Sequence, residues 1–437
     1  MEILIKASQF ILSLSFLIVL HELGHFIPAK LFKTRVEKFY LFFDYKFSLF
    51  KTKIGDTVYG IGWIPLGGYV KISGMIDESM DTEQLKQPAQ PWEFRSKPAW
   101  QRLIIMLGGV IVNFILGILI YIMITFVWGI DYVAPNDVKQ GFAVHETFKE
   151  YGFKDGDKIT KFNGETPLDV TDVNKHLFLR GITSLDVTHQ DGTNETIAIP
   201  ENIGSIMWEN GVMTPFSPII PPVIGTVSTD SPADNAGLKV GDRIVSMNGV
   251  AINYWHQLTS TIVSATEEIA IVVERDGTTE NIVVKPGEDK TIGVAPSTSN
   301  TVVVQHKDYT FLESIPMGNS LAVWTLKDYI SQFKYVFTKK GATSIGGFIA
   351  IGNIFPATWS WQAFWSITAF LSIMLGFMNL LPIPALDGGH VMFTLYEIIT
   401  GRKPNDKFLE YAQITGFILL IALLILANGN DIVKLFS

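Results

Sequence analysis

Apolar residues gather in four long runs along the chain. They lie over Ile5–Phe32, Leu103–Trp128, Phe364–Leu381 and Phe408–Ala427. A helix needs about 20 predominantly apolar residues to cross a bilayer, and each run has a length of that order. The pattern therefore predicts a polytopic α-helical membrane protein with four transmembrane helices.

The first run could instead be a cleaved signal peptide, because Lys6 precedes a short apolar stretch. However, the apolar character continues into the sequence HELGHF without a small-residue cleavage site of the A-x-A type. We therefore expect this run to stay in the protein as the first transmembrane helix.

Lysine and arginine are distributed unevenly around the four runs. Residues 30–102 hold twelve of them, and the short link 400–407 holds Arg402, Lys403 and Lys407. The ends of the chain have only Lys6 and Lys434. Because cytoplasmic loops carry the excess of positive charge, loops 30–102 and 400–407 are expected in the cytoplasm. Both termini and the long segment between the second and third runs are then extracytoplasmic.

That long segment alternates apolar and polar residues between glycine and asparagine turns, which is typical of short strands. It also contains a repeat: GFKDGDKI at 152–159 returns as GLKVGDRI at 237–244, and Asn163-Gly164 returns as Asn248-Gly249. Strand-like tails follow in each copy, over Leu185–Ile199 and Ile269–Val284. The sequence thus predicts a membrane part at 1–130, two small α+β domains at 131–215 and 216–300, a connector with a possible amphipathic helix at 301–360, and a second membrane part at 361–437.

Composition limits the chemistry. The 437 residues include 34 Lys plus Arg and 42 Asp plus Glu, for a net charge of −8, and 48% are hydrophobic. This balance argues against a nucleic-acid partner bound through a basic surface. The chain has no cysteine, so any metal must be held by His, Asp or Glu.

One motif has the pattern of a metal site. His21-Glu22-Leu23-Gly24-His25 is an H-E-x-x-H sequence at the end of the first apolar run. On a helix the two histidines lie on one face, where both can bind one zinc ion. Glu22 is then placed to take a proton from zinc-bound water. Ionisable groups are costly in a membrane and are usually functional there.

A third ligand is expected near the end of the third run, in the sequence NLLPIPALDGGH at 379–390. Asp387 is an acid beside apolar sequence, and Pro382 and Pro384 interrupt the helix before it. Irregular backbone at membrane depth is tolerated only where it is buried in protein or lines a cavity. Asp387 is the preferred third ligand, and whether His390 also contacts the metal stays open.

These motifs together resemble the site-2 protease family of intramembrane zinc metalloproteases. The resemblance covers nearly the whole chain, and it implies that His21, His25 and Asp387 hold zinc and that Glu22 is the catalytic base. It also implies that Asn379 holds the substrate strand, with Pro382 and Pro384 beside it. The stretch from Tyr59 to Lys71, with Gly67 and Gly68, is similar to the family's membrane-associated β-hairpin region, which also contacts substrate. Gly108, Gly109 and Asn113 resemble a family element in the second span whose role is equally explained by helix packing.

The two repeats resemble PDZ domains, the second copy more closely than the first. PDZ domains bind extended peptides at a sheet edge, but no carboxylate-binding glycine loop is evident before Ile224. Peptide binding and a passive role as spacers or steric gates therefore remain alternatives.

The resemblance implies an enzyme of regulated intramembrane proteolysis in the bacterial inner membrane. Its substrates would be single-pass membrane proteins, such as an anti-sigma factor or signal-peptide remnants. An upstream site-1-type protease would trim them first, and periplasmic PDZ domains would then admit them.

Two other functions stay open. One is an idle scaffold that binds peptides, which an intact H-E-x-x-H motif argues against. The other is a metal transporter, which would need further acids or histidines in the other spans, and Asn113 and Glu410 are too little support for it.

Overall fold

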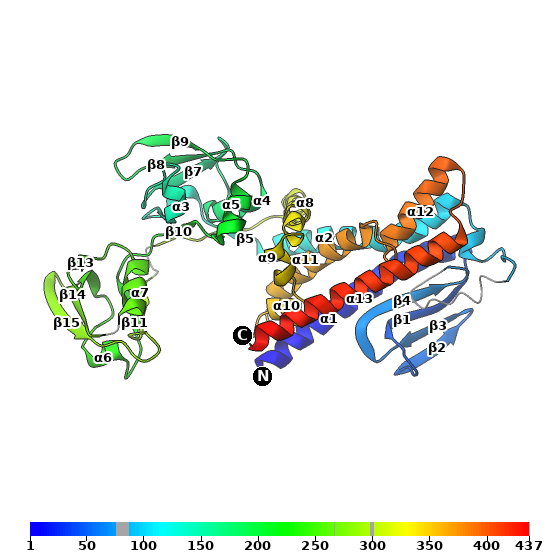
Figure 1. Ribbon diagram of the computed structural model, residues 1–437, viewed down its shortest axis with the longest axis horizontal. Coiled ribbons are helices and arrows are strands. Elements are labelled where there is room, and N and C mark those ends of the chain that lie inside the picture. The colour runs from blue at the N-terminus through cyan, green and yellow to red at the C-terminus, as the bar shows by residue number, and fades with distance from the viewer. Residues whose placement is uncertain (76–86, 266, 298–300, 437) are drawn as a thin grey trace. The chain divides into compact units, whose positions relative to one another are not determined.

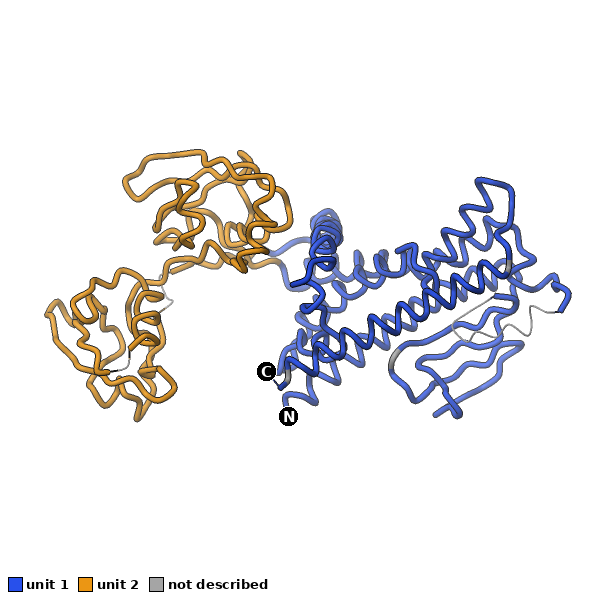
Figure 2. Tube along the Cα trace, viewed as in Figure 1, with its two compact units in different colours: residues 1–129, 308–437 blue, residues 130–307 orange. Residues whose placement is uncertain are grey.

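The computed structural model describes the whole chain except residues 76–86, 266, 298–300 and 437, so Lys86 of the first basic loop lies outside the described residues. The chain forms two compact units. The first unit combines residues 1–129 and 308–437, and the second is residues 130–307 (Figures 1 and 2). Residues from the two ends of the sequence therefore fold together.

Four helices of the first unit are long and apolar enough to cross a membrane. They are α1 (Glu2–Leu31), α2 (Ala99–Trp128), α11 (Trp361–Leu380) and α13 (Asp406–Phe436). They coincide with the four apolar runs, so the predicted number and positions of the long apolar helices are confirmed within the described residues. Buried hydroxyls join them: Ser13 and Thr368 are hydrogen-bonded across α1 and α11 at 2.9 Å.

Helices α1 and α2 cross at two glycines, Gly24 and Gly108. A Cβ atom on either residue would overlap the backbone carbonyl of the other. Small residues allow helix backbones to approach closely in a membrane. The crossing lies within the H-E-x-x-H motif, so α2 packs directly against the histidines.

A mixed four-stranded sheet follows α1. Its strands are β1 (Val36–Phe43), β2 (Phe50–Ile54), β3 (Thr57–Ile61) and β4 (Ile64–Ile72), in the order β2-β3-β1-β4. Strands β1 and β3 are parallel, and the other pairs are antiparallel. The predicted hairpin region is thus larger than a hairpin, because the β2–β3 pair adds to the outer side of β1. Strand β4 is left at the other edge.

The first unit has further helical elements outside these four. They are the 3₁₀ turn η2 (Phe94–Ser96) and the helices α8 (Phe311–Val336), α9 (Lys339–Ser344), α10 (Phe348–Ile354) and α12 (Asp387–Thr400). Helix α8 begins at a capping box made by Thr310 and Glu313. Helix α12 was not anticipated from the sequence. It begins at Asp387 and is fixed to α2 by an ion pair between Glu397 and Arg102 at 2.6 Å.

The second unit contains the sequence repeat as two α+β modules. The first module has the sheet β7 (Lys158–Phe162), β8 (Ser184–Thr188), β9 (Asn194–Ala198), with β6 (Phe142–Val144), β10 (Phe216–Pro218), α3 (Glu146–Lys149), η4 (Val170–Asp172), α4 (Val173–Leu179) and α5 (Ile203–Asn210). The second has β12 (Arg243–Met247), β13 (Val250–Ala251), β14 (Ile269–Arg275) and β15 (Thr278–Val284), with β11 (Ile224–Val227), β16 (Val294–Pro296), α6 (Pro232–Asn235) and α7 (Trp255–Ser264). The turn η3 (Pro135–Asp137) and the antiparallel pair β5 (Ile130–Tyr132) and β17 (Gln305–Lys307) lie where the chain enters and leaves the unit.

Each module has a hydrophobic core of its own. The strands expected in the two tails are present as β8–β9 and β14–β15. Asn163 and Asn248 take positive φ angles of 50° and 48° before their glycines, so the two Asn-Gly turns match. The assignment of the modules to the PDZ family, and the domain boundaries drawn from the sequence, remain predictions.

Candidate metal centre

Two histidines of α1 form one side of the centre. His21 and His25 are one helical turn apart, and their Nε2 atoms are 3.3 Å from each other. Both rings lie against Gly109 of α2, where a Cβ atom would overlap Nε2 of His25 and lie 2.6 Å from Cε1 of His21. The absence of a side chain at residue 109 thus leaves the space that the two imidazoles occupy.

Asp387 forms the other side. It is the first residue of α12 and follows a turn that contains Pro382 and Pro384. Ala385, in that turn, has a φ of 78°, a strained left-handed conformation for a residue with a Cβ atom. Gln413 of α13 accepts a hydrogen bond from the amide of Ala385 at 3.3 Å. The turn, α12 and α13 therefore together set the position of the Asp387 carboxylate.

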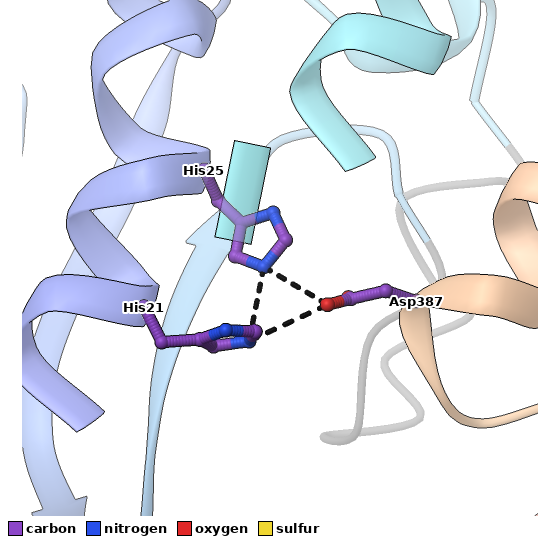
Figure 3. Close-up of side chains that lie close together, drawn as sticks. All are labelled: His21, His25 and Asp387. Carbon is purple, nitrogen blue, oxygen red and sulfur yellow. Dashed lines mark hydrogen bonds and ion pairs between the residues drawn. The ribbon is translucent and has the colours of Figure 1, made fainter. Parts of the chain in front are cut away.

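The three side chains converge on one point (Figure 3). Oδ2 of Asp387 is 3.4 Å from Nε2 of His21 and 3.2 Å from Nε2 of His25. The side chains of the three residues are only 9–16% exposed. His390 is not a member of this cluster and lies on the wall of the cavity beside it.

This donor set fits a zinc ion. Bonds of about 2.0–2.1 Å in a tetrahedral site place the ligand atoms about 3.3 Å from one another, which is the spacing of the three donor atoms. Oδ2 of Asp387 is buried and, among the described residues, receives no well-formed hydrogen bond. A buried carboxylate oxygen without a donor is expected where a cation binds.

The outer nitrogens of the two rings are also engaged. Nδ1 of His25 is 2.9 Å from the carbonyl oxygen of Ile105. Since a carbonyl only accepts, Nδ1 carries the proton and Nε2 keeps its lone pair for a metal. Nδ1 of His21 is 3.0 Å from the amide of Asn113, a residue of α2 that is 0% exposed. The motif pattern drew attention to Asn113 but did not reveal this contact.

A cavity of about 400 Å³ opens beside the cluster. Glu22, which lies between the two histidines in the sequence, lines it and is near the backbone of Val70. The edge strand β4 also lines the cavity and contributes residues 68–72. The arrangement can bring a water molecule, an extended peptide and an acid–base carboxylate to one place.

The residues expected to bind substrate are placed unevenly around this cavity. Gly68 lines it, and a Cβ atom there would lie 2.7 Å from the carbonyl of Tyr40. Gly67 packs against the ring of Phe43 and is not in the wall. Asn379 has its amide nitrogen 3.4 Å from Nε2 of His21. Pro382 and Pro384 shape the turn before Asp387 and are not in the wall either.

No pattern in the sequence indicated the polar network on the side of the cavity formed by the sheet. Tyr69 donates to Asp44 at 2.7 Å, and the ammonium group of Lys38 lies 3.2 Å from the same carboxylate. Burial acts to raise the pKa of Asp44, but the hydrogen bonds from Tyr69 and Lys38 outweigh it and hold that pKa below its usual range. Asp44 therefore stays ionised at neutral pH, paired with the Lys38 cation.

Comparison with known proteins gives consistent matches over almost the full chain. The model of peptidase family M50 matches residues 9–423. A chain of Vibrio cholerae serotype O1 named "Putative zinc metalloprotease" is 30% identical, over 99% of this chain and 100% of its own length. The regulator of sigma-E protease RseP of Escherichia coli K12 is 29% identical over 98% of both chains, and the regulator of sigma E protease of Haemophilus influenzae is 28% identical over 100% of both.

Gly109→Ala is expected to abolish stable zinc binding, because the methyl group would occupy the space of the His21 and His25 rings. Zinc binding is measured as the metal content of the purified protein. Gly117→Ala is the matched control in the same helix, since its methyl group would meet the flexible side chain of Ile373. A Gly109→Ala protein with parental zinc content would contradict the geometry described above.

Proposed function

The chain belongs to peptidase family M50, the site-2 type of zinc metalloprotease, and on that premise we propose that it cuts the transmembrane segments of single-pass membrane proteins. In this proposal His21, His25 and Asp387 hold the zinc ion, and Glu22 is the general base. The observation that carries the assignment is the convergence of three buried donor atoms at 3.2–3.4 Å beside a cavity lined by Glu22.

The chain's own residues supply acid–base chemistry and orientation. Zinc, when bound, acts as a Lewis acid and lowers the pKa of a coordinated water. The Glu22 carboxylate accepts the proton of the attacking water and donates it to the leaving amine. The carbonyl of Ile105 holds the His25 ring in the orientation and tautomer that direct Nε2 at the cluster.

The substrate must be extended at the site, because the hydrogen bonds of a helix shield its peptide bonds. Strand β4 is at the edge of its sheet and lines the cavity over residues 68–72. An edge strand can pair with an added peptide strand. Gly67 and Gly68 keep β4 close to α1 and β1, while Asn379 and the turn with Pro382 and Pro384 would bound the opposite side of the peptide.

The orientation follows from the charge distribution. The basic loops 30–102 and 400–407 would face the cytoplasm, and both termini and the second unit the periplasm of a cell with an inner membrane. Two relatives carry the name regulator of sigma E protease. An anti-sigma factor is therefore the first substrate to test, and remnants of signal peptides are the second.

The two modules of the second unit would act as PDZ-like gates. Substrates with bulky periplasmic domains would be excluded until an upstream site-1-type protease has trimmed them. The domains at 131–215 and 216–300 would carry this selection, the connector 301–360 would join them to the membrane, and the membrane parts 1–130 and 361–437 would carry the chemistry.

Glu22→Gln is expected to retain zinc and to lower cleavage of a model single-span substrate by about 10²–10⁴-fold, the usual contribution of general acid–base catalysis. Zinc content and cleavage in detergent are measured together. Glu410→Gln, at an exposed acid of α13 outside the cavity wall, is the control and should cut at the parental rate. Full proteolysis by zinc-loaded Glu22→Gln would refute the assignment of the base.

Removing residues 133–304 tests the gate. Tyr132 and Gln305 are cross-strand partners, so their strands can be joined by a two-residue Asn-Gly turn. The shortened protein should bind zinc as the parent does and should cut a substrate that still has its folded periplasmic domain. If the untrimmed substrate stays uncut while the trimmed one is cut normally, the second unit is not the gate.

A further inference from the structure

The amide of Asn113 is in an unusual electrostatic setting. Its Nδ2 atom is 3.0 Å from Nδ1 of His21, while its Oδ1 atom is buried and has no hydrogen-bond partner among the residues described. Ser372 of α11 donates to the backbone carbonyl of Asn113 at 2.7 Å, which fixes this turn of α2. An unpaired buried amide oxygen is costly and calls for a physical explanation.

The tautomer of His21 explains the unpaired amide oxygen of Asn113. Its Nε2 atom is the one that faces Asp387 and His25. A neutral imidazole that gives Nε2 to a metal carries its proton on Nδ1, so this nitrogen becomes a donor. The amide as placed suits the metal-free ring, in which Nδ1 accepts. Turning the amide by half a rotation brings Oδ1 to the Nδ1 proton and gives the buried oxygen its partner.

We propose that Asn113 is a positioning residue for His21, whose amide oxygen holds the ring in its metal-binding tautomer. The inference rests on the proposed function only in that His21 binds zinc. It predicts that the acceptor at residue 113, rather than its volume, sets the affinity of the site.

Two variants separate these properties. Asn113→Leu keeps a similar volume and removes the acceptor, so zinc affinity should fall by about 10–100-fold, as expected for the loss of an outer partner of a ligand. Asn113→Asp keeps the acceptor and should retain the parental affinity. Affinity is measured by competition with a chelator, and cleavage by Asn113→Leu should return at saturating zinc with an unchanged KM.

Asn379→Leu is the matched control, because its amide also lies near His21 but on the Nε2 side. It should keep the parental zinc affinity. Parental affinity in folded Asn113→Leu, or equal losses in Asn113→Leu and Asn113→Asp, would overturn the positioning role. A parent protein that binds no zinc would instead refute the proposed function.

The second unit carries an independent observation in its first module. His189, at the end of β8, lies between two acids: Nδ1 is 2.7 Å from Asp157 and Nε2 is 3.0 Å from Glu195. Asp157 is 0% exposed and also accepts the backbone amide of Lys154 at 2.8 Å. The imidazole therefore links the start of β7 to β9.

The second module has the same arrangement with a different cation. Asp242 and Glu280 occur 85 positions after Asp157 and Glu195, and Arg275 bonds to both, at 2.6 Å and 2.7 Å to Asp242 and at 2.6 Å to Glu280. Asp242 likewise accepts the backbone amide of Lys239 at 2.8 Å. The two modules thus share an acid–cation–acid clasp, with histidine in one and arginine in the other.

We propose that the clasp of the first module is a pH-sensitive link that opens at alkaline pH, whereas the clasp of the second is permanent. Arginine stays charged at all relevant pH values, but histidine does not. The groups that face His189 are the carboxylates of Glu195 and Asp157, with Lys154 and Asp191 more distant. A neutral ring has a single N–H group, so it would lose its hydrogen bond to one of the two carboxylates.

The direction of the effect follows from the same contacts. Hydrogen bonds to Glu195 and Asp157 raise the pKa of His189 above its ordinary value. The link therefore stabilises the module fully below the pKa of the unfolded chain, about 6.5, and is lost as the pH rises through the raised value. The selection step proposed for this unit would then respond to the pH outside the membrane.

The test is amide hydrogen exchange of the full-length protein at about pH 6 and about pH 9, on either side of the ordinary pKa of histidine. After correction for the intrinsic exchange rates of the amides, β7–β9 should be less protected at the higher pH. The loss should be about tenfold for each unit by which the pKa of His189 is raised. The protection of β12–β15 should not change. His189→Arg should remove this difference, and Arg275→His should transfer it to the second module.

His189→Gln provides a further check, because it should show at both pH values the lower protection that the parent has at about pH 9. An unchanged pH response in folded His189→Arg would overturn the proposal. So would a folded Arg275→His protein whose second module shows no pH response.

Discussion

The backbone crossing of α1 and α2 is the constraint on which the membrane site depends. At Gly24 and Gly108 the two helices approach so closely that neither residue can carry a Cβ atom. One turn along, the same proximity puts the His25 ring within reach of the Ile105 carbonyl and the His21 ring within reach of Asn113. A wider crossing would separate these polar groups from their partners, and a buried polar group left unpaired costs about 1–3 kcal/mol.

The second half of the site comes from the far end of the chain. A helix that continued through Pro382 would carry Asp387 past the histidines, whereas the turn before α12 stops α11 and starts a new helix at the acid. The strain at Ala385 is held by Gln413 of α13 and by the packing of α12 against α2 through Arg102 and Glu397. Strain that persists at such a place must be fixed by its surroundings.

The sequence predicts local features well and tertiary ones poorly. The four spans follow from hydropathy, and the two histidines share a face because helical geometry is periodic. Asp387 could be proposed as a partner only through its cost in a membrane and a family resemblance. The parallel pairing of β1 with β3, the empty space at Gly109 and the orientation of Asn113 depend on contacts between distant segments, which no local pattern records.

The sheet and the metal cluster solve one physical problem together. A peptide that leaves its helix inside a membrane exposes amides and carbonyls that lipid cannot satisfy. Strand β4 lies at the edge of its sheet and lines the same cavity as Glu22 and Asp387. When a substrate is recognised through its backbone groups, its side chains matter less than the ability of the segment to unwind. Selection by side chain or by size must then come from elsewhere in the protein, and we propose that it lies in the second unit, whose two modules each have a core of their own.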